Sequence, residues 1–228
     1  MASIGLSEPN TSTVPLFSIV ALGVFARDGG REALAYVMTG NIVVSLLFGT
    51  MNSVQSHTEW LRFQGGFDYF ATLPIRRYAF TLAVALTFLL FSLPPLVVTL
   101  CLGSLWLRVP ISLSPLVVIV IPLCALPLAG LGATLGLIGR TRGESGSLTR
   151  LLTLLMITLG PVVIPPDRLP GIALVLGLLS PATYAASALR QTMVGPVTGR
   201  IVADIAALAA MTVLFLWLVG RKMNWHQG

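Results

Sequence analysis

Long runs without a charged side chain constrain this chain more than any other feature of its sequence. Such runs cover residues 33–58, 78–107 and 109–139. Each is longer than the roughly 20 residues that an α-helix needs to cross about 30 Å of hydrocarbon. Because the backbone in lipid must satisfy its own hydrogen bonds, such runs cross as helices. We therefore predict an all-α integral membrane protein in which these three runs are spans.

The overall composition agrees with that class. Hydrophobic residues make up 55% of the chain and charged residues 10%, whereas soluble domains carry about 25% charged residues. The net charge of +6 comes from arginines that flank the apolar runs, which is the pattern of membrane topology. We therefore predict no nucleic-acid partner.

Four shorter apolar runs, at residues 9–26, 151–166, 169–189 and 201–220, need separate consideration. Within the first, residues 15–26 extend only about 18 Å as a helix, so they form either a short tilted span or an interfacial helix. Together the runs predict a single transmembrane domain over residues 1–228, built as a six-helix bundle. In the run at 109–139, Gly132 and Gly136 form a GxxxG step, which predicts close packing against another helix.

Residues 167–193 form two apolar halves separated by Ser180 and Pro181. This break favours a helix, a turn and a second helix, as in a re-entrant hairpin on the extracytoplasmic side. A full crossing is the alternative. The positive-inside rule does not choose between them, because both give eight basic residues inside and six outside. Length and the break favour the hairpin.

An amphipathic segment follows the first long run. Four aromatic residues recur at helical spacing and predict an apolar stripe on one helix: Trp60, Phe63, Phe67 and Phe70. Arg62 and Asp68 would face away from this stripe. Such a helix either binds a partner protein or lies in the headgroup layer without a partner.

Several chemistries find no support in the sequence. No GxxxxGK[ST] loop occurs, and Lys222 is the single lysine, so the chain is not expected to hydrolyse ATP or to be an enzyme. His57 and His226 have no carboxylate or cysteine at ligand spacing, so we predict no metal and no cofactor in this chain. Asp204 is essentially the only ionisable residue inside a span, and we interpret it as an interfacial residue at a helix start. This scarcity argues against an ion-driven transporter.

Two segments carry a family resemblance. LRFQGGFDYFATLPIRRYAF at residues 61–80 and VVIPPDRLPGIALVLGLLSPATYAASALRQTMVG at residues 162–195 resemble the membrane subunit of type-2 ATP-binding cassette (ABC) exporters. That class includes the daunorubicin-type drug exporters. The first segment resembles the cytoplasmic piece before the third span, and the second resembles the extracytoplasmic re-entrant hairpin. The chain departs from the family pattern at Leu61, where members usually carry an acidic residue.

The resemblance implies how the chain works. Residues 55–78 become a segment with a cytoplasmic coupling helix, which docks on ABC ATPase subunits present in two copies, each holding ATP and Mg. A second permease chain completes a homodimer or heterodimer in the plasma (inner) membrane of a prokaryote. This dimer exports a substrate that is expected to be small and hydrophobic or amphipathic. The implied ATPase-coupling residues are Glu59, Arg62, Phe63, Phe67, Asp68 and Phe70, and the implied hairpin residues are Pro170, Ser180, Pro181 and Arg190.

A different class of function stays open. The same topology fits a non-transporting membrane scaffold or assembly factor whose amphipathic segment binds another cytoplasmic protein. Co-purification separates the two, because an exporter subunit retains an ATPase whereas a scaffold retains a partner without a nucleotide site.

Overall fold

The computed structural model describes residues 30–66, 114–141, 143–162 and 177–222, together with scattered residues between 79 and 97 and residues 171 and 175. All regular structure in these parts is helical, which agrees with the predicted all-α class; the count of six helices extends beyond the described residues. The described elements are α2 (Gly30–Leu46), the π-helix η2 (Leu47–Asn52), α3 (Ser53–Phe63), α6 (Val117–Ile138), α7 (Glu144–Leu159), α9 (Pro181–Met193) and α10 (Arg200–Lys222).

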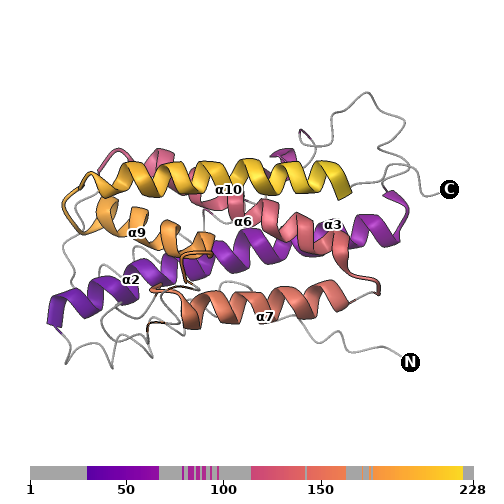
Figure 1. The fold of residues 1–228 in the computed structure, drawn as a ribbon, viewed down its shortest axis with the longest axis horizontal. Coiled ribbons are helices and arrows are strands. Elements are labelled where there is room, and N and C mark those ends of the chain that lie inside the picture. Colours follow the sequence, from indigo (N-terminus) through magenta and orange to yellow (C-terminus); the bar gives the residue numbers. More distant parts are fainter. Residues whose placement is uncertain are drawn as a thin grey trace.

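Three described helices are long and apolar enough to cross a membrane. They are the continuous helix Tyr36–Phe63, formed by most of α2 with η2 and α3, and the helices α6 and α10. Figure 1 shows these helices extended along the long axis of the molecule. The runs at 33–58 and 109–139, predicted as spans, largely form helices of membrane length, and the shorter run at 201–220 does as well. The run at 78–107 lies largely outside the described residues.

Glycines of α6 allow the helices to approach closely. A Cβ atom built on Gly132 would clash with the carbonyl oxygen of Met51 in η2, and one on Gly136 would lie 2.8 Å from the carbonyl oxygen of Gln55 in α3. On another side of α6, a Cβ on Gly130 would lie 2.8 Å from Cβ of Phe215 in α10. The packing role predicted for Gly132 and Gly136 is confirmed.

The burial of the long helices differs. Most of the apolar stretch of Tyr36–Phe63 is buried inside the bundle, whereas only 22% of the corresponding stretch of α10 is buried. Val202 and Val213 of α10 are 67% and 68% exposed. Apolar side chains of this kind match a lipid environment, so α10 presents an outer face of the bundle.

Residues 140–150 have the polar composition of a loop, but helix α7 already begins within them, at Glu144. The Glu144 carboxylate accepts hydrogen bonds from the backbone N–H groups of Arg140 (2.8 Å) and Thr141 (3.2 Å), which fixes the short connection from α6. Ser145 and Thr149 are buried, whereas Leu148 is exposed. Ser145 and Thr149 are thus small polar side chains of a helix that face the neighbouring helices.

Helix α9 begins at the predicted break. Ser180 has an extended backbone (φ −91°, ψ 123°), and Pro181 occupies the first turn, where its missing N–H costs nothing. The 13 residues of α9 extend about 20 Å, which is too short to cross a bilayer and favours the hairpin over a crossing. Pro170 and most of the first limb lie outside the described residues, so the hairpin over 167–193 stays a prediction.

The bundle has two ends that are used below as reference points. At the Arg62 end, α3, α6 and α10 finish and α7 begins; at the Arg200 end, α10 begins while α7 and α9 finish (Figure 1). The backbone N–H of Ser114 donates to the carbonyl of Thr192 (3.1 Å), which joins the start of α6 to the end of α9.

Candidate functional site

Arg62 fastens the end of α3 to the end of α6. Its Nη1 donates hydrogen bonds to the carbonyl oxygens of Leu137 (2.7 Å) and Gly139 (2.6 Å). The last carbonyls of a helix lack an intrahelical donor and lie at the negative end of the helix dipole. A guanidinium group is well matched to this position because it brings both a positive charge and several N–H donors.

Glu59 makes the corresponding contact to the start of α7. Its Oε1 accepts a hydrogen bond from the backbone N–H of Gly143 (2.7 Å), and its Oε2 accepts one from Nε2 of Gln55 (2.7 Å). Gly143 has φ of 92°, a conformation that glycine adopts without the steric cost of a side chain. We call Gln55, Glu59 and Arg62, with Leu137, Gly139 and Gly143, the Arg62 junction.

The junction shows how two residues predicted to contact an ATPase are used within the chain. Glu59 and Arg62 form hydrogen bonds with the α6–α7 connection. The apolar side chains beside them differ in exposure: Trp60 is 56% exposed and Phe63 is partly buried. The His57 ring stacks on Trp60 with centroids 6.3 Å apart, and the Arg62 guanidinium lies 5.8 Å from the Phe63 ring centroid.

The predicted stripe is not carried by one unbroken helix. Helix α3 ends at Phe63, and the N–H of Gln64 bonds to the carbonyl of Trp60. Gly65 follows with φ of 70°, the conformation in which glycine commonly terminates a helix. Trp60 and Phe63 therefore belong to α3, before this turn. The remaining predicted coupling residues, Phe67, Asp68 and Phe70, lie outside the described residues.

At the Arg200 end, the predicted hairpin residue Arg190 is held by three neighbours. Its Nη2 donates to the carbonyl oxygens of Pro161 (3.5 Å) and Val162 (3.2 Å). Its guanidinium carbon lies 3.4 Å from the ring centroid of Tyr36, the geometry of a cation–π contact. Arg190 thus connects α9 with α2 and with the end of α7.

Asp204 lies near the start of α10, as expected, but it is buried against a neighbouring helix. The residue is 2% exposed and lies in the second turn of α10. Its Oδ2 accepts hydrogen bonds from Oγ of Ser187 (2.6 Å) and Nε2 of Gln191 (2.9 Å), which fix α10 to α9. A buried carboxylate is stable only with such donors, and this one serves as a helix-to-helix contact.

Sequence reasoning missed several partners in these two regions. The i, i+4 spacing of Gln55 and Glu59 on one helix was a readable signal of their contact. No comparable signal pointed to Gly143 or Tyr36, because their partners are 84 and 154 positions away in the chain.

Comparison with known proteins identifies the class. A family model described as "ABC-2 type transporter" matches residues 13–194. No curated protein and no solved structure matches the chain. The matched range covers well over half of the chain, and the membrane-length apolar helices agree with it. The chain is therefore a multi-pass membrane permease that belongs to the ABC-2 type transporter family.

Proposed function

We propose that this chain is the transmembrane subunit of an ATP-driven exporter, which forms a substrate pathway as a dimer and is driven by two separate ATPase subunits. In this proposal the ATPases hold ATP and Mg, and the permease resides in the plasma membrane of a prokaryote. The observation that carries the proposal is the Arg62 junction, because it links an exposed aromatic helix end to two other helices of the bundle.

The orientation follows from charge. Five described basic residues lie in the half of the bundle at the Arg62 end, whereas the Arg200 end has Arg31 in the first turn of α2 and two others. Basic residues accumulate on the cytoplasmic side of membrane proteins, which supports placing the Arg62 end in the cytoplasm. The five are Arg62, Arg140, Arg150, Arg221 and Lys222, and the two are Arg190 and Arg200.

The junction gives the coupling residues separate tasks. Trp60, which is 56% exposed, offers the apolar contact area that a protein partner buries, and the proposal extends this surface to Phe63, Phe67, Asp68 and Phe70. Glu59 and Arg62 then hold α3 to the α6–α7 connection, so a displacement of the α3 end is passed to both helices. A motor that closes on nucleotide moves as a rigid body, and contacts of this kind transmit its motion.

Reconstitution with the partner ATPase tests the proposal. Phe67→Ala combined with Phe70→Ala is expected to abolish coupling, so that substrate no longer stimulates ATP hydrolysis and export stops in proteoliposomes. Trp60→Ala is expected to lower the stimulation severalfold. The matched control is Trp217→Ala on α10, because Trp217 is 54% exposed but lies on the outer helix.

Two outcomes contradict the proposal. Unchanged stimulation and export in the Phe67 and Phe70 double variant would show that this surface does not receive the motor. Recovery of a stoichiometric partner that lacks a nucleotide site would favour a scaffold of the same topology instead.

A further inference from the structure

A cavity of about 490 Å³ at the Arg200 end is bordered by two arginines. Arg190 comes from α9, and Arg200 is the first residue of α10. Both arginines line this cavity. Because a guanidinium group binds phosphate and carboxylate oxygens with paired N–H donors, two of them beside one cavity favour an anion.

No carboxylate within the described residues neutralises these arginines. Arg190 donates to the carbonyl oxygens of Pro161 and Val162 and interacts with the Tyr36 side chain, its Nε has no hydrogen-bond partner, and Arg200 is exposed. Asp204, the nearby buried acid, is satisfied by Ser187 and Gln191. Among the described residues, the wall of this cavity therefore carries a net positive charge.

An unpartnered hydroxyl gives a second, independent indication of a ligand. Thr183 lines the same cavity and is only 8% exposed, and its Oγ1 has no hydrogen-bond partner among the described residues. A buried polar atom without a partner destabilises the fold, because it has lost its hydrogen bonds to water. A ligand oxygen in the cavity would remove that cost.

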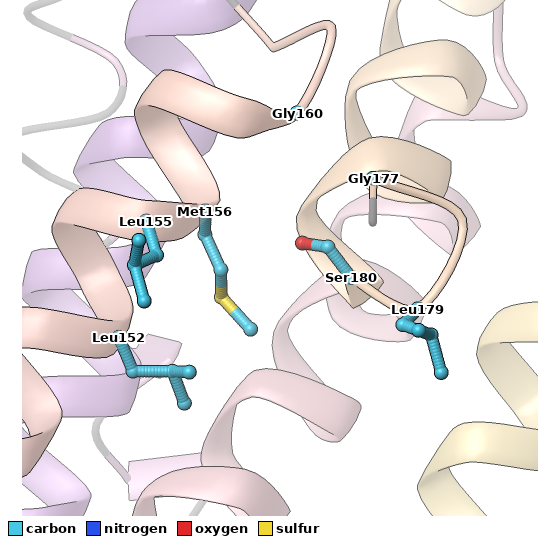
Figure 2. A pocket seen from close by; sticks show the side chains of 7 residues that line it. All are labelled: Leu152, Leu155, Met156, Gly160, Gly177, Leu179 and Ser180. Atoms are coloured by element: carbon cyan, nitrogen blue, oxygen red, sulfur yellow. The ribbon is translucent and has the colours of Figure 1, made fainter. Parts of the chain in front are cut away.

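A second cavity, of about 360 Å³, lies next to the first and is apolar. Figure 2 shows Met156 of α7 and the hydroxyl of Ser180 pointing toward one another across it. The two cavities border the same two turns, because Gly160 and Leu179 line the second cavity whereas their chain neighbours Pro161 and Leu178 line the first. A cavity lined by two arginines thus lies close to an apolar cavity.

We propose that the two cavities together bind one anionic amphiphile, with a phosphate or carboxylate headgroup between Arg190 and Arg200 and an alkyl chain beside Met156. The charge of the first cavity and the apolar lining of the second match the two halves of such a molecule. Binding requires no ATPase, and only a role of the amphiphile as cargo rests on the proposed function.

Lipid titration of the purified full-length chain in a neutral detergent tests the site, with native mass spectrometry as the readout. Dioleoyl phosphatidylglycerol is expected to bind about tenfold more tightly than dioleoyl phosphatidylcholine. Arg200→Gln should reduce the affinity for phosphatidylglycerol about tenfold, since one charged contact is lost. Arg221→Gln, at the other end of the same helix, is the control and should leave the affinity unchanged.

Arg200→Gln is the decisive variant because Arg200 is exposed and holds no other described residue, whereas Arg190→Gln also removes the contacts to Pro161 and Val162. The alkyl-chain part is tested by Leu155→Trp, which introduces a large ring at a residue that lines the second cavity. It should weaken binding of dioleoyl but not dihexanoyl phosphatidylglycerol. Leu154→Trp is its control, since Leu154 is the exposed neighbour and does not line the cavity.

The proposal is overturned if both lipids bind equally, if Arg200→Gln binds phosphatidylglycerol like the unmodified chain, or if inorganic phosphate alone displaces the lipid at millimolar concentration. If the site is confirmed, proteoliposomes with the ATPase identify the source of the amphiphile. Occupancy that falls during ATP turnover assigns it as cargo, and occupancy that stays constant assigns it as a bilayer lipid; either result supports the site. Failure of lipid binding with intact coupling would leave the proposed function in place.

Discussion

Nη1 of Arg62 lies 2.6 Å from the carbonyl oxygen of Gly139, although the two residues are 77 positions apart in the chain. The same atom also reaches the carbonyl oxygen of Leu137, so one guanidinium group satisfies two acceptors at the end of α6. The exposed end of α3 is thereby fixed to a helix with which it shares no connecting loop.

Arg62→Gln is expected to lower the free energy of unfolding by about 2 kcal/mol, because it removes charge-assisted hydrogen bonds to carbonyls that have no other intrahelical donor. Thermal unfolding in detergent measures the change. Arg140→Gln is the control, because Arg140 is exposed in the same connection and only its backbone N–H forms a described contact. Equal stability of both variants would contradict a fastening role for Arg62.

Gly136→Ala is expected to destabilise the bundle by about 1–3 kcal/mol, the usual cost of overpacking. The added methyl group would meet backbone of α3 at 2.8 Å, and backbone cannot turn aside as a flexible side chain does. Chemical denaturation in micelles gives the comparison. Gly146→Ala in α7 is the matched change, since a Cβ there meets nothing within 4 Å and alanine favours the helix. A loss of stability in Gly146→Ala as large as that in Gly136→Ala would refute the packing explanation.

Asp204→Ala is expected to cost about 1–3 kcal/mol of stability because the donors on Ser187 and Gln191 lose their acceptor in a buried place. Asp204→Asn should cost less, since the amide oxygen still accepts one hydrogen bond. The difference is measurable as a shift in unfolding temperature. Two variants with the same unfolding temperature as the unmodified chain would mean that this contact does not hold α9 to α10.

Tyr36→Leu is expected to loosen the contact between α2 and α9, because Arg190 loses the ring on which it stacks. A cation–π contact contributes from about 0.5 to 2 kcal/mol, with the larger values where water is excluded. Tyr36→Phe retains a ring and should retain much of this energy. Hydrogen exchange of the α9 backbone amides reports the effect, and equal exchange rates in the Leu and Phe variants would exclude it.

Much of the fold was predictable because the membrane imposes simple rules. Uncharged runs longer than 20 residues gave two of the three helices of membrane length, and the GxxxG step gave the close approach of α6 to α3. The Ser180–Pro181 pair marked the start of α9 correctly, since proline fits the first turn of a helix.

Other features depended on contacts between distant residues. The sequence around residues 140–150 has the polar composition of a loop, but α7 begins at Glu144, and Ser145 and Thr149 are buried in it. The contacts of Asp204 could not be predicted because its donors, Ser187 and Gln191, lie on a different helix. Periodicity describes one helix at a time, and these partners become visible only when two helices are placed together.

The continuous helical stretch from Tyr36 to Phe63 is 28 residues, or about 40 Å, long. Its two ends contact different neighbours. Near one end, the Tyr36 ring packs against Arg190 beside the charged cavity, and the last turns carry Glu59 and Arg62. The π-helix η2 interrupts its regular winding midway, next to Gly132, and π-helical turns inside α-helices are frequent at functional positions. The two ends of the bundle are thus joined by a single backbone, whose irregular turn lies where α6 approaches it closely.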